Sequence, residues 1–169
     1  TSFIVLFLVT AQSHQIEAIL VFNKTDAYDS ATEAIVKNLI QVYSKIGYAC
    51  IKISAKEGEN LDVVKSKMKG KTSMFSGHSG VGKSTLVNTI EPRLNIKTKA
   101  ISELHQQGQH TTTFAEMFDL SFDAHIIDTP GITGFGVVDM EPAELDHYFP
   151  ELFRIKSDCK FHNCLHLHE

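Results

Sequence analysis

A glycine-rich segment carries the clearest chemistry of the chain. Residues 77–84 read GHSGVGKS and match the pattern G-x-x-x-x-G-K-[ST] in full. Glycines let the backbone curl so that several N–H groups and the positive end of the following helix face a phosphate. We expect Lys83 to reach the β- and γ-phosphates of a nucleotide and the Ser84 hydroxyl to coordinate Mg²⁺. The residues expected to surround the phosphates are Gly77, His78, Ser79, Gly80, Val81, Gly82, Lys83, Ser84 and Thr85.

Two later segments predict the rest of a magnesium and γ-phosphate site. The sequence DTPG begins at Asp128, directly after an apolar stretch. We expect Asp128 to hold Mg²⁺ through water and the Gly131 N–H to sense the γ-phosphate. Residues 108–113, GQHTTT, lie between the two motifs, and one of their threonines can complete the Mg²⁺ shell in the triphosphate state. We take Thr112 as the candidate; the alternative is a Ser/Thr-rich turn without a ligand.

A tetrapeptide near the start of the chain fits the guanine-reading motif N-K-x-D. It runs from Asn23 to Asp26. Guanine offers two donors to one carboxylate, whereas adenine presents an acceptor at N1 and no amino group at C2. Sites built on such substrate hydrogen bonds discriminate by roughly 10⁴-fold, so Asp26 predicts selection of guanine. We expect Asn23 and the Lys24 stem to hold the loop and cover the base.

A tripeptide further along supplies a companion loop. Ser54, Ala55 and Lys56 follow another apolar segment, and the Ala55 N–H is expected to meet guanine O6. Short motifs of this kind are common by themselves. Their value comes from recurring at the ends of successive strands in a chain that also carries a phosphate-binding loop.

The elements that must position these motifs follow from hydrophobic patterning. Apolar strands alternate with helical patterns, so we expect an α/β fold with a mostly parallel sheet, flanking helices and ligands beyond the carboxyl ends of the strands. One helix should bury Ile35, Leu39, Val42 and Ile46. The expected buried strands are 18–22, 50–53 and 74–75, the helices 31–46, 61–68 and 85–90, and the hairpin 114–120 with 124–128 around a turn at 121–123.

Composition excludes several classes of protein. The 169 residues are 43% hydrophobic and 21% charged, which fits one globular domain with at most part of a second. A net charge of −4 is the wrong sign for a fragment that wraps nucleic acid by charge alone. The apolar run at 3–9 is far shorter than the roughly 20 residues that cross a bilayer, so we expect a buried helix or strand and no membrane anchor or signal peptide. Three cysteines do not make a disulfide framework and favour the cytoplasm.

The order of the motifs indicates circular permutation. GTPases usually read P-loop, switch threonine, D-x-x-G, N-K-x-D and S-A-K, but here the two base-recognition motifs precede the P-loop. The helix at 61–68 then joins what are ordinarily the chain ends, which domain termini permit because they often lie close together. The fold predicted is therefore a circularly permuted P-loop GTPase.

The chain closely resembles the ribosome small-subunit-dependent GTPase A family (RsgA, also called YjeQ). The resemblance rests on the permuted order, GHSGVGKST, GQHTTTF, DTPGI and a terminal Cys/His cluster. It implies a late-acting factor in small-subunit maturation that binds GTP and GDP with Mg²⁺, is a monomer, and contacts the subunit and its rRNA through the full-length protein. It also implies a permuted GTPase domain at 1–140, the start of a small α-helical zinc-binding domain at 141–169, and absence of the family's N-terminal OB-fold from this chain.

The zinc expectation rests on the end of the chain. Cys159, Cys164 and His166 resemble the family's C-x4-C-x-H-x5-C, whose fourth ligand would fall beyond residue 169. Thiolates and imidazole suit tetrahedral Zn²⁺. In the chain as given, His162 or His168 could substitute for that ligand, or the site could be empty.

One position separates the chain from Ras-type enzymes. Ile132 follows Gly131, where Ras-type proteins carry the glutamine that orients the attacking water. Isoleucine cannot do this, so we expect slow intrinsic hydrolysis stimulated by the ribosome, with His110 as the candidate to reach the water; the alternative is an exposed loop histidine. Two rival functions stay open: a GTP-dependent binding module with little hydrolysis, and an ATP-using P-loop kinase.

Overall fold

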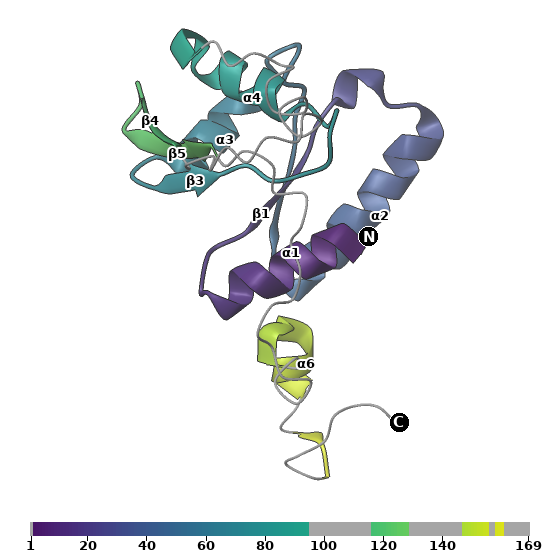
Figure 1. The fold of residues 1–169 in the computed structure, drawn as a ribbon. Helices are drawn as coiled ribbons and strands as arrows, with labels where there is room; N and C mark the ends of the chain where they lie inside the picture. The colour runs from purple at the N-terminus through teal and green to yellow at the C-terminus, as the bar shows by residue number, and fades with distance from the viewer. Residues whose placement is uncertain (1, 95–115, 129–146, 156–157, 161–169) are drawn as a thin grey trace, which may run out of the picture. The chain divides into compact units, whose positions relative to one another are not determined.

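The computed structural model describes residues 2–94, 116–128, 147–155 and 158–160 (Figure 1). Strands and helices alternate as expected, and the described residues belong to two compact units. One unit contains the first helix, residues 37–46 of the second and the last described helix; the other contains the candidate nucleotide-binding motifs. The elements are α1 (Ser2–Ser13), β1 (Ile19–Phe22), η1 (Thr25–Ala27), α2 (Ser30–Ile46), β2 (Ala49–Lys52), α3 (Leu61–Met68), β3 (Thr72–Met74), α4 (Lys83–Ile90), η2 (Pro92–Leu94), β4 (Glu116–Leu120), β5 (Ala124–Asp128) and α6 (Pro150–Ile155).

The strands form two sheets and not the single sheet we expected. One contains β1 and β2; the other has the order β3-β5-β4, with β3 parallel and β4 antiparallel to β5. The predicted hairpin is confirmed, since Leu120 pairs with Ala124 across the turn. Within the described strands, no ladder joins the two sheets. Alternating strands and helices in a sequence identify the strands but not the edges that pair.

The strand before the glycine-rich segment is displaced from its predicted place. We expected residues 74–75, but β3 is Thr72–Met74, paired with residues 125–127 of β5. Its residues are exposed or half-buried, so the expectation of a buried strand is wrong here. The strand forms because residues 72–74 pair with β5. Thr72 and Ser73 are polar, so the hydrophobic pattern of the sequence did not mark them as part of a strand.

The predicted apolar face of α2 is only partly buried, because Ile46 is half-buried but two of the four predicted residues are exposed. Ile35 is 62% exposed and Val42 46% exposed, whereas Val36 and Tyr43 are buried. Leu39 lies between the two stripes and is half-buried. Two stripes offset by one residue share the same helical period, so the sequence pattern could not separate them.

The apolar run near the start of the chain lies in helix α1, but the expected burial holds only at the end of the run, since Leu6 is 36% exposed. Leu8, Val9 and Ala11 are buried on it. None of the helices in the described part of the chain is long and apolar enough to span a bilayer.

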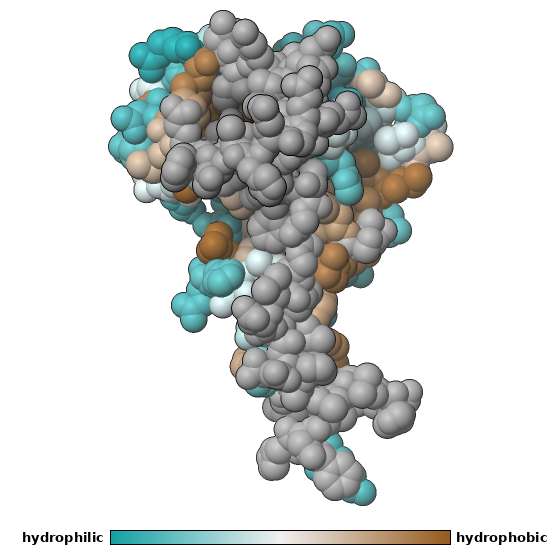
Figure 2. Space-filling model, in the orientation of Figure 1, coloured by the Kyte–Doolittle hydropathy of each residue, from teal (hydrophilic) through white to brown (hydrophobic). Residues whose placement is uncertain are grey.

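The core of the unit that carries the motifs is built from the elements leading to and from them. Not every hydrophobic residue is buried in it: on the face drawn in Figure 2, hydrophobic residues are exposed among hydrophilic ones. Buried apolar residues come from α2, from β2 and the loop after it, from α3 and α4, and from the hairpin. Those residues are Val36, Ile51, Ile53, Ala55, Leu61, Val64, Met68, Leu86, Val87, Ile90, Leu120, Ala124 and Ile126.

Two isoleucines of this unit provide a matched test of the core. Ile53 is 0% exposed and Ile35 is 62% exposed. We expect Ile53→Ala to lower the free energy of unfolding by about 2–5 kcal/mol, because burial is lost and a cavity remains. Ile35→Ala should change it by less than about 0.5 kcal/mol. Urea unfolding measures both, and equal losses would contradict the assigned face of α2.

Candidate nucleotide-binding site

The glycine-rich loop connects β3 to α4 and curls around a lysine ammonium group. Gly82 has φ 97° and precedes the first turn of α4 in the left-handed conformation, which disfavours a residue with a Cβ. Lys83 Nζ donates hydrogen bonds to the carbonyl oxygens of Gly77, at 2.6 Å, and His78, at 2.9 Å. Partial burial lowers the pKa of the Lys83 ammonium. The loop thus presents a cation and the start of a helix at one place, with Ser84 buried in the first turn.

The side chain of Asn23 joins three loops. Its Nδ2 donates to the Val81 carbonyl at 3.0 Å, and its Oδ1 accepts the Ala55 N–H at 3.0 Å. A Cβ at Gly82 would overlap the amide of Asn23, so the close approach needs glycine at that position. The guanine-reading loop, its companion loop and the phosphate-binding loop therefore meet at one residue.

Lys24 reinforces this junction from a strained backbone position. It has φ 69° and ψ 37°, which is uncommon for a residue with a Cβ. Its N–H donates to Asn23 Oδ1 at 2.7 Å, and its Nζ donates to the Gly80 carbonyl at 2.7 Å. The Lys24 side chain thus reaches from the N-K-x-D loop to the phosphate-binding loop.

The candidate base-reading carboxylate, that of Asp26, is exposed and is held by a hydrogen bond from Ser54. The Ser54 hydroxyl donates to Asp26 Oδ1 at 2.6 Å and accepts the Glu57 N–H at 3.1 Å. Ser54 is fully buried. Its hydrogen bond is the main cause that lowers the pKa of Asp26, so the carboxylate stays ionised at neutral pH. An ionised carboxylate is the acceptor that the two guanine donors require.

Three contacts of the site lie outside the short motifs and were not predicted from the sequence. The Thr89 hydroxyl donates to the Ala55 carbonyl at 2.9 Å and ties α4 to the companion loop. The Tyr28 hydroxyl donates to the Asn23 carbonyl at 2.9 Å, and desolvation raises the pKa of this phenol. The Thr25 hydroxyl donates to Glu59 at 2.8 Å. A polar residue on α4, one turn after Thr85, was the available hint for Thr89, but no short motif includes these partners.

Some of the other predicted site residues lie in the described part of the chain, and others lie outside it. Asp128 is the last residue of β5, while Lys56 is exposed and forms an ion pair with Glu57 at 3.2 Å. Cys159 is half-buried, and its Sγ donates to the Ile155 carbonyl at 3.9 Å. The described ranges contain no group of three His, Cys, Asp or Glu side chains that could hold a metal. Outside the described residues lie the predictions for His110, Thr112, Gly131, Cys164 and His166.

The arrangement can bind a phosphorylated purine. Lys83 and the curled backbone suit an anion, and Asp26 lies on a loop that Asn23 attaches to the same cradle. A serine hydroxyl and an aspartate carboxylate are the hard oxygen ligands that Mg²⁺ prefers. The donor types at Ser84 and Asp128 therefore fit this ion.

Comparisons with known proteins agree with this geometry. The sequence model of a family described as RsgA GTPase matches residues 1–138. The chain is 64% identical over its whole length to a small ribosomal subunit biogenesis GTPase RsgA of Christiangramia forsetii and 62% identical to that of Flavobacterium johnsoniae. It spans about half the length of these relatives, 54% and 52%.

Two solved structures are similar to the chain over nearly all of its length. The crystal structure of YjeQ from Thermotoga maritima has a TM-score of 0.79 and 35% identity, and the match covers 100% of this chain and 55% of that one. The structure of YloQ, described as a circularly permuted GTPase, has a TM-score of 0.71 and 30% identity, covering 97% and 50%.

Two glycines test the contact between Asn23 and the phosphate-binding loop. Gly80→Ala and Gly82→Ala both place a methyl group on a backbone with positive φ, which costs about 1–2 kcal/mol. Only the second methyl group meets the Asn23 amide, because nothing lies within 4 Å of a Cβ at Gly80. We expect Gly82→Ala to weaken GDP binding by about 10-fold more than Gly80→Ala, equivalent to about 1.4 kcal/mol. Calorimetric titration measures both, and equal losses would contradict the bridging role of Asn23.

Proposed function

The chain belongs to the RsgA GTPase family, and on this premise we propose that it binds GTP and GDP and hydrolyses GTP during late maturation of the small ribosomal subunit. The convergence of three loops on Asn23 is the observation that carries the proposal. Separate P-loops and N-K-x-D tetrapeptides are each common, but a single amide that contacts both Val81 and Ala55 supports one site for phosphate and base. The comparisons give no support to an ATP-using kinase or a non-hydrolysing module.

Each predicted residue takes a role in this site. Lys83 would contact the β- and γ-phosphates, and Asp26 would accept the two guanine donors. Ser84, Thr112 and Asp128 would hold Mg²⁺, which when bound neutralises negative charge on the β- and γ-phosphates. The Ala55 N–H donates to Asn23 in this structure, so guanine O6 would share that donor or displace the amide.

The catalytic proposal concerns the attacking water. Ile132 has no polar atom with which to orient it, and His110 beside the switch threonines is the proposed replacement. Hydrolysis would then be slow until a partner brings His110 to the water. The names of the relatives support the small ribosomal subunit as that partner.

The Cys/His cluster at the end of the chain would bind zinc. Cys159, Cys164 and His166 would supply three ligands of one structural Zn²⁺, with the fourth beyond residue 169. The full-length protein, as a cytoplasmic monomer, would contact rRNA. Release of one equivalent of zinc from intact protein after thiol modification would test the metal assignment.

Phosphate release with and without small subunits tests the proposed activity. We expect slow release by the intact protein alone and at least about 10-fold stimulation by purified subunits, a smaller factor than the roughly 10³- to 10⁵-fold that a partner-supplied arginine gives other GTPases. Lys83→Ala should remove both rates, because the phosphates lose their cation. A rate near zero with subunits present would favour a binding module without hydrolysis.

Replacement of Asp26 tests base recognition. Asp26→Asn should shift preference from guanine toward xanthine nucleotides, because the new amide can donate to the C2 carbonyl of xanthine. Asp29→Asn is the matched control, since Asp29 accepts the Thr32 N–H at the start of α2 and does not belong to the motif. Competition binding with GDP, XDP and ADP measures the change. Retained guanine selectivity in Asp26→Asn would contradict the assignment.

A further inference from the structure

A buried carboxylate lies at the end of α4 away from the phosphate-binding loop. Among the residues that the structure describes, three polar or charged ones are buried: Ser54, Ser84 and Glu91. The first two belong to the candidate site. Glu91 is 2% exposed and directly follows the last residue of α4. Burial of a carboxylate is unfavourable unless it is paired, so its partners indicate its role.

Both oxygens of Glu91 accept hydrogen bonds. Oε1 accepts from Arg93 Nε at 2.8 Å, and Oε2 accepts the backbone N–H of Ser121 at 2.7 Å. The Arg93 bond first and the Ser121 bonds second lower the pKa of Glu91 to about 2, so it is ionised throughout the neutral range. The second bond is long-range: it links the end of α4 to the turn between β4 and β5.

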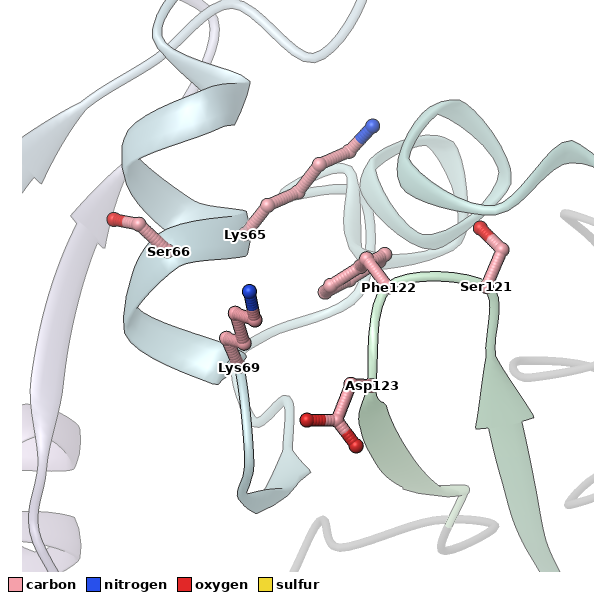
Figure 3. A pocket seen from close by; sticks show the side chains of 6 residues that line it. All are labelled: Lys65, Ser66, Lys69, Ser121, Phe122 and Asp123. Carbon is pink, nitrogen blue, oxygen red and sulfur yellow. The ribbon is translucent and has the colours of Figure 1, made fainter.

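The other side of this turn is held by α3 and the residues that follow it. The Gly70 N–H donates to the Asp123 carbonyl at 2.6 Å, and Lys65 Nζ lies 5.7 Å from the centre of the Phe122 ring. Figure 3 shows Phe122 projecting from the turn toward α3. Phe122 lines a hollow of about 370 Å³ together with residues of α3. The turn is therefore fixed from two sides, by α3 and by Glu91.

The two elements that meet at this contact carry the predicted Mg²⁺ ligands Ser84 and Asp128 at their other ends. Helix α4 starts with Lys83 and Ser84 and is about 12 Å long, and β5 runs from the turn to Asp128 over about 17 Å. Beside the phosphate-binding loop, Met74 of β3 pairs with Ile127. The Glu91 contact at the far end thus limits rotation of β5 relative to α4.

We infer that Glu91 is a positioning residue, which sets Asp128 relative to Ser84 by fixing the β4–β5 turn to the end of the P-loop helix. The inference rests on the proposed function, because it concerns the Mg²⁺ ligands of the GTP site. The positioning role of Glu91 requires its hydrogen bond to Ser121. It does not require the ion pair with Arg93, whose side chain is largely exposed.

Four variants separate these two bonds. Glu91→Met keeps the size of the side chain and removes both acceptors, while Glu91→Gln keeps a carbonyl oxygen for the Ser121 N–H and loses the charge that faces Arg93. Arg93→Met removes the ion pair alone. Glu91→Asp withdraws the carboxylate by one methylene group and serves if Glu91→Met does not fold.

The readout is the Mg²⁺ concentration that gives half-maximal GTP hydrolysis by the intact protein. We expect Glu91→Met to raise it by about 10-fold, the lower end of the range for residues that orient metal ligands, and Glu91→Asp to raise it by a smaller factor. Glu91→Gln and Arg93→Met should stay within about 2-fold of wild type. Affinity for GDP without Mg²⁺ should be unchanged in all four, because Lys83 and the loop remain intact.

Several results would overturn the inference. An unchanged Mg²⁺ requirement in Glu91→Met or in Glu91→Asp would do so, as would an equal loss of Mg²⁺-free GDP affinity, which indicates a structural role only. If wild-type protein hydrolyses no GTP, the proposed function fails, and the Mg²⁺ dependence of GTP binding in the same variants still tests the position of Asp128.

Discussion

The side chain of Asn23 is the contact on which the site depends. One amide donates to Val81 and accepts from Ala55, and its approach to the phosphate-binding loop is possible because Gly82 has no side chain. Each such hydrogen bond contributes only about 0.5–1.5 kcal/mol to stability. The importance of the contact is therefore geometric: it fixes the distance between the groups that would bind phosphate and those that would bind a base.

The contacts of Asn23 join parts of the chain that are far apart in sequence. Asn23 and Val81 are 58 residues apart, and Asn23 and Ala55 are 32 apart. The base-recognition loops come first, after β1 and β2, and α3 then leads to β3 and the phosphate-binding loop. The Thr89 hydroxyl bonds to Ala55 from α4 and adds a second link between the two parts. Neither part alone contains a complete site.

The sequence allowed the motifs to be predicted because their chemistry tolerates few residue types. Glycine at position 82 and aspartate at 26 are examples, and the hairpin was predicted from two strand-like segments around a short turn at 121–123. The prediction for Ile35 and Val42 on α2 was wrong because the rows of apolar residues through Ile35 and through Val36 have the same helical period. The partners of Ser121, Ala55 and Asn23 could not be predicted, since they depend on which elements pack together and not on local pattern.

Hydrogen exchange of the intact protein with GDP and Mg²⁺ tests the central claim most directly. A single site predicts that backbone amides of residues 23–26, 54–56 and 78–84 gain protection together, with the same GDP dependence, and that ADP at the same concentration protects none of the three to a similar degree. Protection confined to residues 78–84, or equal protection by ADP, would contradict the account, because phosphate would then bind without recognition of guanine.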